Sequence, residues 1–266
     1  MAKNNTWWAL VVLALPLFAH AEAMFGNDMA GDRKLPKTWG IGIDYFGMKH
    51  PYQIDSLNFS PPVLPITDPS ILPIENEIRY ADIKIDFWLT PFLNVFGIYG
   101  RIDGDTSIDL GVLGLPLPPE VNSLLVEYDG DVYGGGIVLV VGGDRWFASL
   151  TGTYTDTDLE GDFKSTVKAT TLQPRVGVRI DEDIEFWLGG YIVDAEEQHT
   201  GTLTLDLGPL AGGPVDLDFG VDLSQEEDFN PSIGMHTAWA DAWEATVEVG
   251  AGDRRTVLVN FTYRFE

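Results

Sequence analysis

The sequence predicts an all-β fold, a single antiparallel barrel of about ten membrane-spanning strands with long loops on the extracellular side. In the last run of the chain, 257–265, apolar or aromatic residues occupy every second position, which is typical of a strand with one face toward lipid. About ten such period-two segments occur, and the connections between them alternate in length. The segments lie near residues 38–47, 77–90, 92–106, 130–142, 145–157, 164–180, 184–198, 228–240, 242–250 and 255–265.

The N-terminus has the pattern of a secretory signal peptide. Lys3 precedes the apolar run 7–18, and the small-residue pattern 19–23 follows it. This order predicts cleavage after Ala21 or Ala23. The apolar run is about half the roughly 20 residues that a membrane-spanning helix needs, so we do not expect a retained helical anchor.

The prediction divides the chain into three parts. Residues 1–23 form a signal peptide that is removed, residues 24–37 form an N-terminal periplasmic segment, and residues 38–266 form the transmembrane barrel. The chain contains no cysteine, which excludes a disulfide framework and a lipid-modified N-terminal cysteine. Strand pairing and side-chain packing must therefore hold the barrel together.

The chain is strongly acidic, with 16 Lys and Arg against 41 Asp and Glu and a formal net charge of −25. Such a charge repels nucleic acid and attracts divalent cations or basic partners. Nucleic acid is therefore excluded as a partner.

The connections between strands are very short at one end of the barrel and mostly long at the other, as expected for the periplasmic and extracellular ends of a membrane barrel. The long ones are 48–76, 107–129 and 199–227, and all three contain apolar runs. Either these loops extend the strands and pack on one another as a cap, or they form an apolar pocket for a ligand or partner. The spacing of apolar residues also predicts a short helix over 119–128.

Six tryptophans remain after residue 23, and each begins or ends a predicted strand near a short turn or the N-terminal entry. Amphipathic indoles concentrate at membrane interfaces, so we expect one periplasmic girdle from all six. Tyr45 and Tyr154 are the candidates for the opposite girdle. The alternative is that the tryptophans anchor a soluble core. The girdle residues are Trp39, Trp88, Trp146, Trp187, Trp239 and Trp243.

Charged residues alternate with the apolar ones and are predicted to face the lumen, because a Lys or Arg facing lipid near the membrane centre costs about 2–4 kcal/mol. They could form a structural polar plug or a charged constriction that selects small solutes. The predicted lumen-lining charges are Asp44, Asp82, Lys84, Asp86, Arg101, Asp103, Arg175, Arg179, Glu185, Glu244, Glu248 and Arg264.

Together these features resemble small bacterial outer-membrane β-barrels, without pointing to a particular family among them. The resemblance implies location in the Gram-negative outer membrane and a monomeric barrel. It also implies contact with outer-membrane lipid and lipopolysaccharide. During biogenesis the implied partners are periplasmic chaperones and the barrel-assembly machinery.

Barrel enzymes provide a test for catalysis. Barrel proteases use Asp-x-His with further acids, and barrel lipid hydrolases use His-x-Ser, but neither pattern surrounds His50, His199 or His236. We therefore expect no enzyme activity and no cofactor.

One segment resembles the opening of an EF-hand calcium loop. Asp156, Asp158 and Glu160 alternate before a glycine, but Val167 stands where the closing Glu is required. These three acids are weak metal candidates, and the alternative is an acidic hairpin tip.

Two classes of function remain open. The first is passive uptake or binding of a small solute, which could be apolar, through a narrow, loop-capped lumen. The second is a structural or surface-interaction barrel without transport.

Overall fold

The computed structural model describes residues 23–30, 35–60, 68–114, 123–161, 163–196, 198–206, 213–225 and 229–266. The predicted signal peptide and the cleavage point after Ala21 therefore lie outside the described residues, apart from Ala23. No helix among the described residues is long and apolar enough to cross a membrane.

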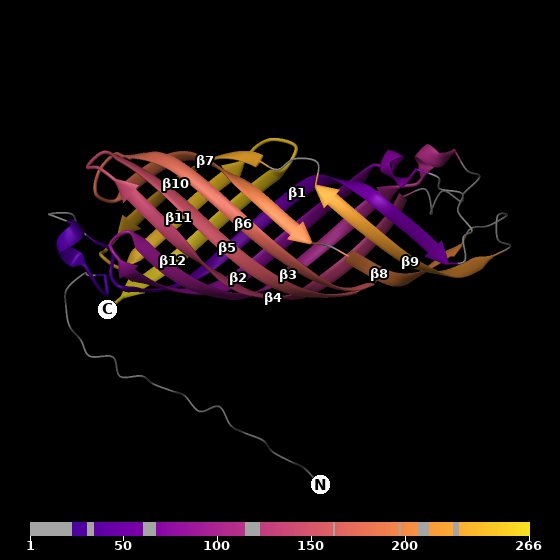
Figure 1. Cartoon of the computed structure of the whole chain (residues 1–266), viewed down its shortest axis with the longest axis horizontal. Helices are drawn as coiled ribbons and strands as arrows, with labels where there is room; N and C mark the ends of the chain where they lie inside the picture. The colour runs from indigo at the N-terminus through magenta and orange to yellow at the C-terminus, as the bar shows by residue number, and fades with distance from the viewer. Residues whose placement is uncertain are drawn as a thin grey trace, which may run out of the picture.

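Ten antiparallel strands form a closed barrel, as predicted (Figure 1). They run in the order β1 to β7 and then β10 to β12, and β12 pairs with β1 to close the ring. The ten are β1 Trp39–Ser60, β2 Ile74–Thr90, β3 Leu93–Asp109, β4 Ser123–Gly142, β5 Trp146–Gly161, β6 Phe163–Arg179, β7 Ile184–Glu196, β10 Phe229–Trp239, β11 Trp243–Gly250 and β12 Arg255–Phe265.

The closing seam depends on the aromatic terminal run that the sequence contains. Strand β12 pairs with β1 from Trp39 opposite Phe265 to Lys49 opposite Arg255. Backbone N–H and C=O groups cannot remain unpaired in lipid, so a sheet that crosses a membrane must close on itself. Short turns join the strands at the end where Trp39 and Phe265 lie, and we call this the periplasmic end.

The outward faces of the strands form a lipid belt of exposed apolar side chains, among them Ile43, Val176 and Leu188, whose exposed fractions are 64%, 64% and 68%. Outward tyrosines follow toward the extracellular end, namely Tyr45, Tyr99, Tyr133 and Tyr154. Beyond them the outward positions become charged. This charged collar consists of Lys49, Arg79, Arg101, Asp131, Asp156, Lys168, Asp194 and Arg255.

On the extracellular side of the charged collar the barrel continues as a ring of fewer strands, which we call the upper ring. Strands β7, β10, β11 and β12 stop near the collar, whereas β1 to β6 continue. The hairpin of β8 (Gln198–Asp206) and β9 (Pro214–Gln225) completes the upper ring, because β9 pairs with β1 and β8 pairs with β6 at the far end of the molecule (Figure 1). Much of the predicted loops 48–76 and 199–227 is therefore strand.

The third long connection, 107–129, is also largely strand, since β3 extends to Asp109 and β4 begins at Ser123. The helix predicted over 119–128 is wrong for Ser123–Tyr128, which pairs in register with β3. Residues 115–122 lie outside the described residues. Strand pairing overrode the local apolar spacing, which fits either a helix or a strand over so short a run.

Five apolar residues in and beside the extracellular connections are buried. Ile54, Leu72, Ile74, Leu110 and Leu217 all have exposed fractions between 0% and 4%. They come from β1, the 3-10 helix η2 (Pro69–Ile71) and its flank, β2, the end of β3 and β9. These described apolar residues of the extracellular connections are thus shielded from water.

The lipid belt can be tested by one substitution and its positional control. Ile43→Arg is expected to lower the free energy of unfolding by about 2–4 kcal/mol, because it places a charge near the centre of the belt. Asn58→Arg, on the exposed upper part of the same strand, is expected to change it by under about 1 kcal/mol. Denaturant titration in phospholipid vesicles measures both, and equal losses for the two variants would contradict this placement of the belt.

Candidate functional site

The inward faces of the strands line an elongated cavity of about 1720 Å³ inside the barrel. Toward the extracellular end its wall on β1 to β4 is largely apolar. Toward the periplasmic end it is charged and aromatic. The apolar wall comprises Phe46, Met48, Ile78, Ile98, Ile102 and Val132, and a row of hydroxyls from β5 faces the same lumen, namely Ser149, Thr151, Thr153, Thr155 and Thr157.

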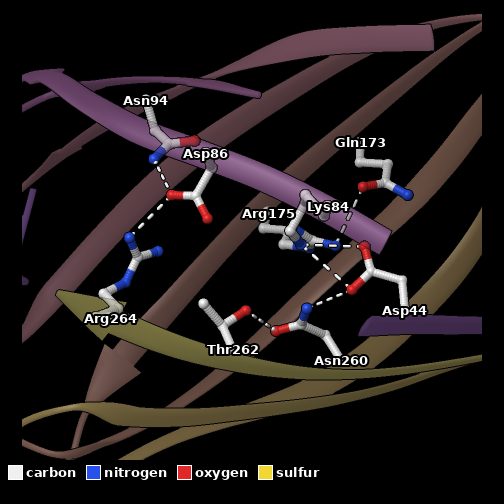
Figure 2. Close-up of polar contacts among 9 residues, drawn as sticks. All are labelled: Asp44, Lys84, Asp86, Asn94, Gln173, Arg175, Asn260, Thr262 and Arg264. Atoms are coloured by element: carbon white, nitrogen blue, oxygen red, sulfur yellow. Dashed lines mark hydrogen bonds and ion pairs between the residues drawn. The ribbon is translucent and has the colours of Figure 1, made fainter. Parts of the chain in front are cut away.

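Arg264 on β12 organises the periplasmic end of the lumen. Its Nη1 donates to Asp86 Oδ1 at 2.8 Å, and its Nε lies 2.7 Å from Glu244 Oε2. Asn94 Nδ2 donates to the same Asp86 oxygen at 2.6 Å, and the guanidinium lies 6.0 Å from the Trp88 ring centroid. Figure 2 shows the Asn94–Asp86–Arg264 contacts, which join three strands.

Asp44 on β1 forms a second group of contacts, also drawn in Figure 2. Lys84 Nζ lies 3.0 Å from Asp44 Oδ2, and Asn260 Nδ2 donates to Asp44 Oδ1. Thr262 Oγ1 in turn donates to Asn260 Oδ1 at 3.1 Å. The Asp44 carboxylate thus has both a cation and an amide as partners.

Glu248 on β11 is fully buried, with an exposed fraction of 0%. Its Oε2 accepts from Arg175 Nε at 2.8 Å and from Trp187 Nε1 at 3.0 Å, while Oε1 accepts from Ser232 Oγ at 2.6 Å. Arg175 stacks on Trp187 at 5.3 Å. Because Arg175 belongs to β6 and Glu248 to β11, this ion pair passes in front of two intervening strands.

Arg179 forms a third arginine site near a periplasmic turn. Its Nε donates to Glu185 Oε1 at 2.7 Å, and its Nη1 donates to the Gly143 carbonyl oxygen at 2.8 Å. The guanidinium lies 5.5 Å from the Phe147 ring centroid. The hydrogen bond from Arg179 to the Gly143 carbonyl also links the turn between β4 and β5 to the barrel wall.

The extracellular end of the cavity meets an apolar cluster. Val126, Tyr128 and Leu159 are buried there, and Phe219 of the β8–β9 hairpin packs against them. The Tyr128 hydroxyl donates to Asn76 Oδ1 at 2.9 Å across β3. A solute in the cavity would therefore meet these packed side chains in this direction.

The N-terminal segment contacts the periplasmic end of the barrel. Met24 N–H donates to the Trp88 carbonyl at 2.9 Å, and Phe25 N–H donates to the Leu89 carbonyl at 3.0 Å. Met29, in the 3-10 helix η1 (Asn27–Ala30), contributes to the cavity lining. The predicted periplasmic segment thus borders the lumen.

Ten of the predicted lumen charges lie on inward faces, and two do not. The inward residues are Asp44, Asp82, Lys84, Asp86, Arg175, Arg179, Glu185, Glu244, Glu248 and Arg264.

The prediction was wrong for Arg101 and Asp103. Both are exposed on the outer face of β3, where Arg101 pairs with Asp129 and its side chain is 65% exposed. Phe96, Ile98 and Ile102 occupy the inner face of this strand. Arg101 and Asp103 lie at and above the charged collar, so their outward position costs no burial of charge in lipid.

The prediction of a girdle of all six tryptophans was wrong for Trp88 and Trp187. Both line the lumen, and Trp187 has an exposed fraction of 6%. Trp88 lies two residues from Asp86, and Trp187 lies two residues from Glu185, so each tryptophan shares a strand face with a predicted lumen carboxylate. The period of two therefore already indicated that both tryptophans face inward. The other four lie near the periplasmic end, and Trp146, Trp239 and Trp243 have exposed fractions of 53%, 40% and 44%.

The acids Asp156, Asp158 and Glu160 lie in strand β5 on its outward face. A straight strand cannot wrap oxygens around one ion as a calcium loop does. Asp158 instead accepts a hydrogen bond from Thr166 Oγ1 at 3.3 Å. Among the described residues no group of His, Asp and Glu is arranged to hold a metal ion.

Sequence reasoning missed the aromatic residues at mid-height in the lumen. Phe46 and Tyr191 meet at a centroid distance of 6.1 Å, although they come from β1 and β7. Tyr80 lies directly opposite Phe46 on β2. Their even spacing from Asp44 and Asp82 was the available signal, because residues two apart share a face.

No protein-family model matches the sequence, and no curated protein matches it. Several solved structures follow a similar chain path. The translocator domain of the autotransporter NalP from Neisseria meningitidis is 11% identical, with 90% of this chain and 91% of that chain covered and a TM-score of 0.41. An outer-membrane channel from Pseudomonas putida F1 is 11% identical, with 88% and 98% covered and a TM-score of 0.41. The Pseudomonas putida toluene transporter TodX is 8% identical, with 91% and 93% covered and a TM-score of 0.35.

Proposed function

We propose that this protein is a Gram-negative outer-membrane barrel that binds a small, largely apolar solute in its lumen and allows its passive uptake. The observation that carries the proposal is the apolar wall of β1 to β4 in a cavity of about 1720 Å³. Apolar cavities with a few convergent polar groups are the usual form of small-molecule sites. The proposal assigns no catalytic step to the barrel.

The lumen has an apolar half and a charged half, and the apolar half favours an apolar solute over a small ion. An ion would lose hydration beside Ile98, Ile102 and Val132 without gaining a partner there. An apolar molecule is stabilised at the same wall by removal of its surface from water, at about 25 cal/mol per Å². The hydroxyl row of β5, the strand next to β4, can hydrogen-bond a single polar group of such a solute.

The outer surface supports the proposed location. The lipid belt suits an acyl core, and the charged collar above it suits the phosphate and sugar region of lipopolysaccharide. We propose that the barrel acts there as a monomer, in contact with lipid around its circumference, after delivery by periplasmic chaperones and the barrel-assembly machinery.

One observation favours the structural alternative. The Arg175–Glu248 pair is almost wholly buried, with side-chain exposed fractions of 15% and 0%, and it occupies the lumen between β6 and β11. In this alternative the polar residues fill the barrel and nothing passes. Passage requires a route beside these ion pairs, and conductance measurements separate the two functions.

Binding can be tested with the neutral aromatic 4-methylbenzyl alcohol and the protein in lipid nanodiscs, with empty nanodiscs as the blank. Ile98→Trp is expected to lower the affinity about tenfold or more, because the added ring fills the apolar part of the cavity. Ile83→Trp, on the outward face of β2, is the matched control and is expected to change nothing. Saturable binding measured by equilibrium dialysis would be absent if the proposal is wrong.

Conductance in planar bilayers tests the role of the buried ion pair. Arg175→Ala is expected to raise conductance, because it removes the side chain that reaches across the lumen to Glu248. Arg101→Ala removes the same type of side chain from the outer surface and is expected to leave conductance unchanged. A barrel that stays silent in both variants, and binds no neutral aromatic, supports the structural alternative.

A further inference from the structure

Three of the arginines that line the lumen share one arrangement, in which the guanidinium contacts both a carboxylate and an aromatic ring. A cation in this position gains both an ion pair and a cation–π contact. The three sets are Arg175 with Glu248 and Trp187, Arg179 with Glu185 and Phe147, and Arg264 with Asp86 and Trp88.

Asp82 has the carboxylate and the neighbouring rings of this arrangement but no cation. It lies on the inward face of β2, lines the cavity and has an exposed fraction of 6%. Its Oδ1 has no hydrogen-bond partner, and Asp82 forms no ion pair with any residue that the structure describes. The other five inward carboxylates predicted from the sequence each have a Lys or Arg partner, and these are Asp44, Asp86, Glu185, Glu244 and Glu248.

The rings beside Asp82 follow from the strand register. Tyr80 is two residues away on the same face, and Phe46 lies opposite Tyr80 on β1. The Tyr80 hydroxyl lies close enough to the Asp82 carboxylate to interact with it, but it supplies no positive charge. A carboxylate, a hydroxyl and two aromatic rings thus meet where the charged half of the lumen borders the apolar half.

Within the described part of the chain, no lysine or arginine forms an ion pair with Asp82. Lys84 lies two residues from Asp82, but its ammonium bonds Asp44, which is directly opposite Asp82 on β1 (Figure 2). Two carboxylates therefore share the neighbourhood of one lysine. An unpaired buried carboxylate is costly, so the site is electrostatically suited to a cation from outside.

We propose that Asp82 binds the ammonium group of a cationic, otherwise apolar solute such as an aralkyl amine. The ammonium would donate to Asp82 Oδ1 and lie against the faces of Tyr80 and Phe46, while the apolar body extends along Ile98 and Ile102. This inference rests on the proposed function, because it uses the same cavity. It adds that the solute carries a positive charge at one end.

A pair of isosteric probes tests the inference. The affinity for 4-methylbenzylammonium is compared with that for 4-methylbenzyl alcohol by equilibrium dialysis of the full-length protein in zwitterionic nanodiscs at constant ionic strength. The wild-type barrel is expected to prefer the ammonium probe about tenfold or more. In Asp82→Asn this ratio is expected to fall to about one, since the carboxylate is replaced by a neutral amide of the same shape.

Asp131→Asn is the matched control, because it removes one negative charge from the outward charged collar and leaves the lumen intact. It is expected to keep the wild-type ratio. Heat-modifiability on gels verifies that both variants are folded barrels.

The outcomes separate the two proposals. If neither probe binds the wild-type barrel, the proposed function itself fails. If the alcohol binds but the ammonium probe has no advantage, only the inference about Asp82 fails. An advantage that survives in folded Asp82→Asn, or that disappears equally in Asp131→Asn, also overturns it, because the preference then comes from another carboxylate or from the overall negative charge.

Discussion

The structure depends on one constraint, which is that backbone hydrogen-bonding groups must find partners within the protein wherever lipid surrounds it. The pairing of β12 with β1 meets this requirement by removing both sheet edges. Once the ring is closed, the period of two gives every strand one face toward lipid and one toward the lumen. The belt, the charged collar and the cavity all follow from which residues occupy which face.

The same constraint explains why the lumen is crowded with charge. Ionisable side chains that cannot face lipid turn inward, where they are close enough to pair. Arg175, Arg179 and Arg264 each join strands through a carboxylate and an aromatic ring. Toward the extracellular end of the same cavity, apolar residues of β1 to β4 form the wall. The division between the two halves is the basis of the proposed binding site for a small, largely apolar solute.

Much of this arrangement could be predicted from the sequence, because contact with lipid makes the alternation of apolar and polar residues strict. The prediction of inward and outward faces failed where both faces of a strand have similar polarity. On β3, Val95, Gly97 and Tyr99 outside are no more apolar than Phe96 and Ile98 inside, so only Arg101 and Asp103 indicated a phase, and they indicated the wrong one. The β8–β9 hairpin could not be predicted either, because its pairing with β1 and β6 depends on segments far apart in the sequence.

Arg101 and Arg175 show that the position of a charge relative to the lipid belt decides its role. The two residues are chemically identical, but the Arg101 side chain is 65% exposed beside Asp129, and the Arg175 side chain is 15% exposed against Glu248. Within the belt an arginine can only turn inward, and there it becomes part of the lumen. At the collar it can face outward, where water and headgroups solvate it. The height of a residue along its strand must therefore be known before its charge indicates which face it occupies.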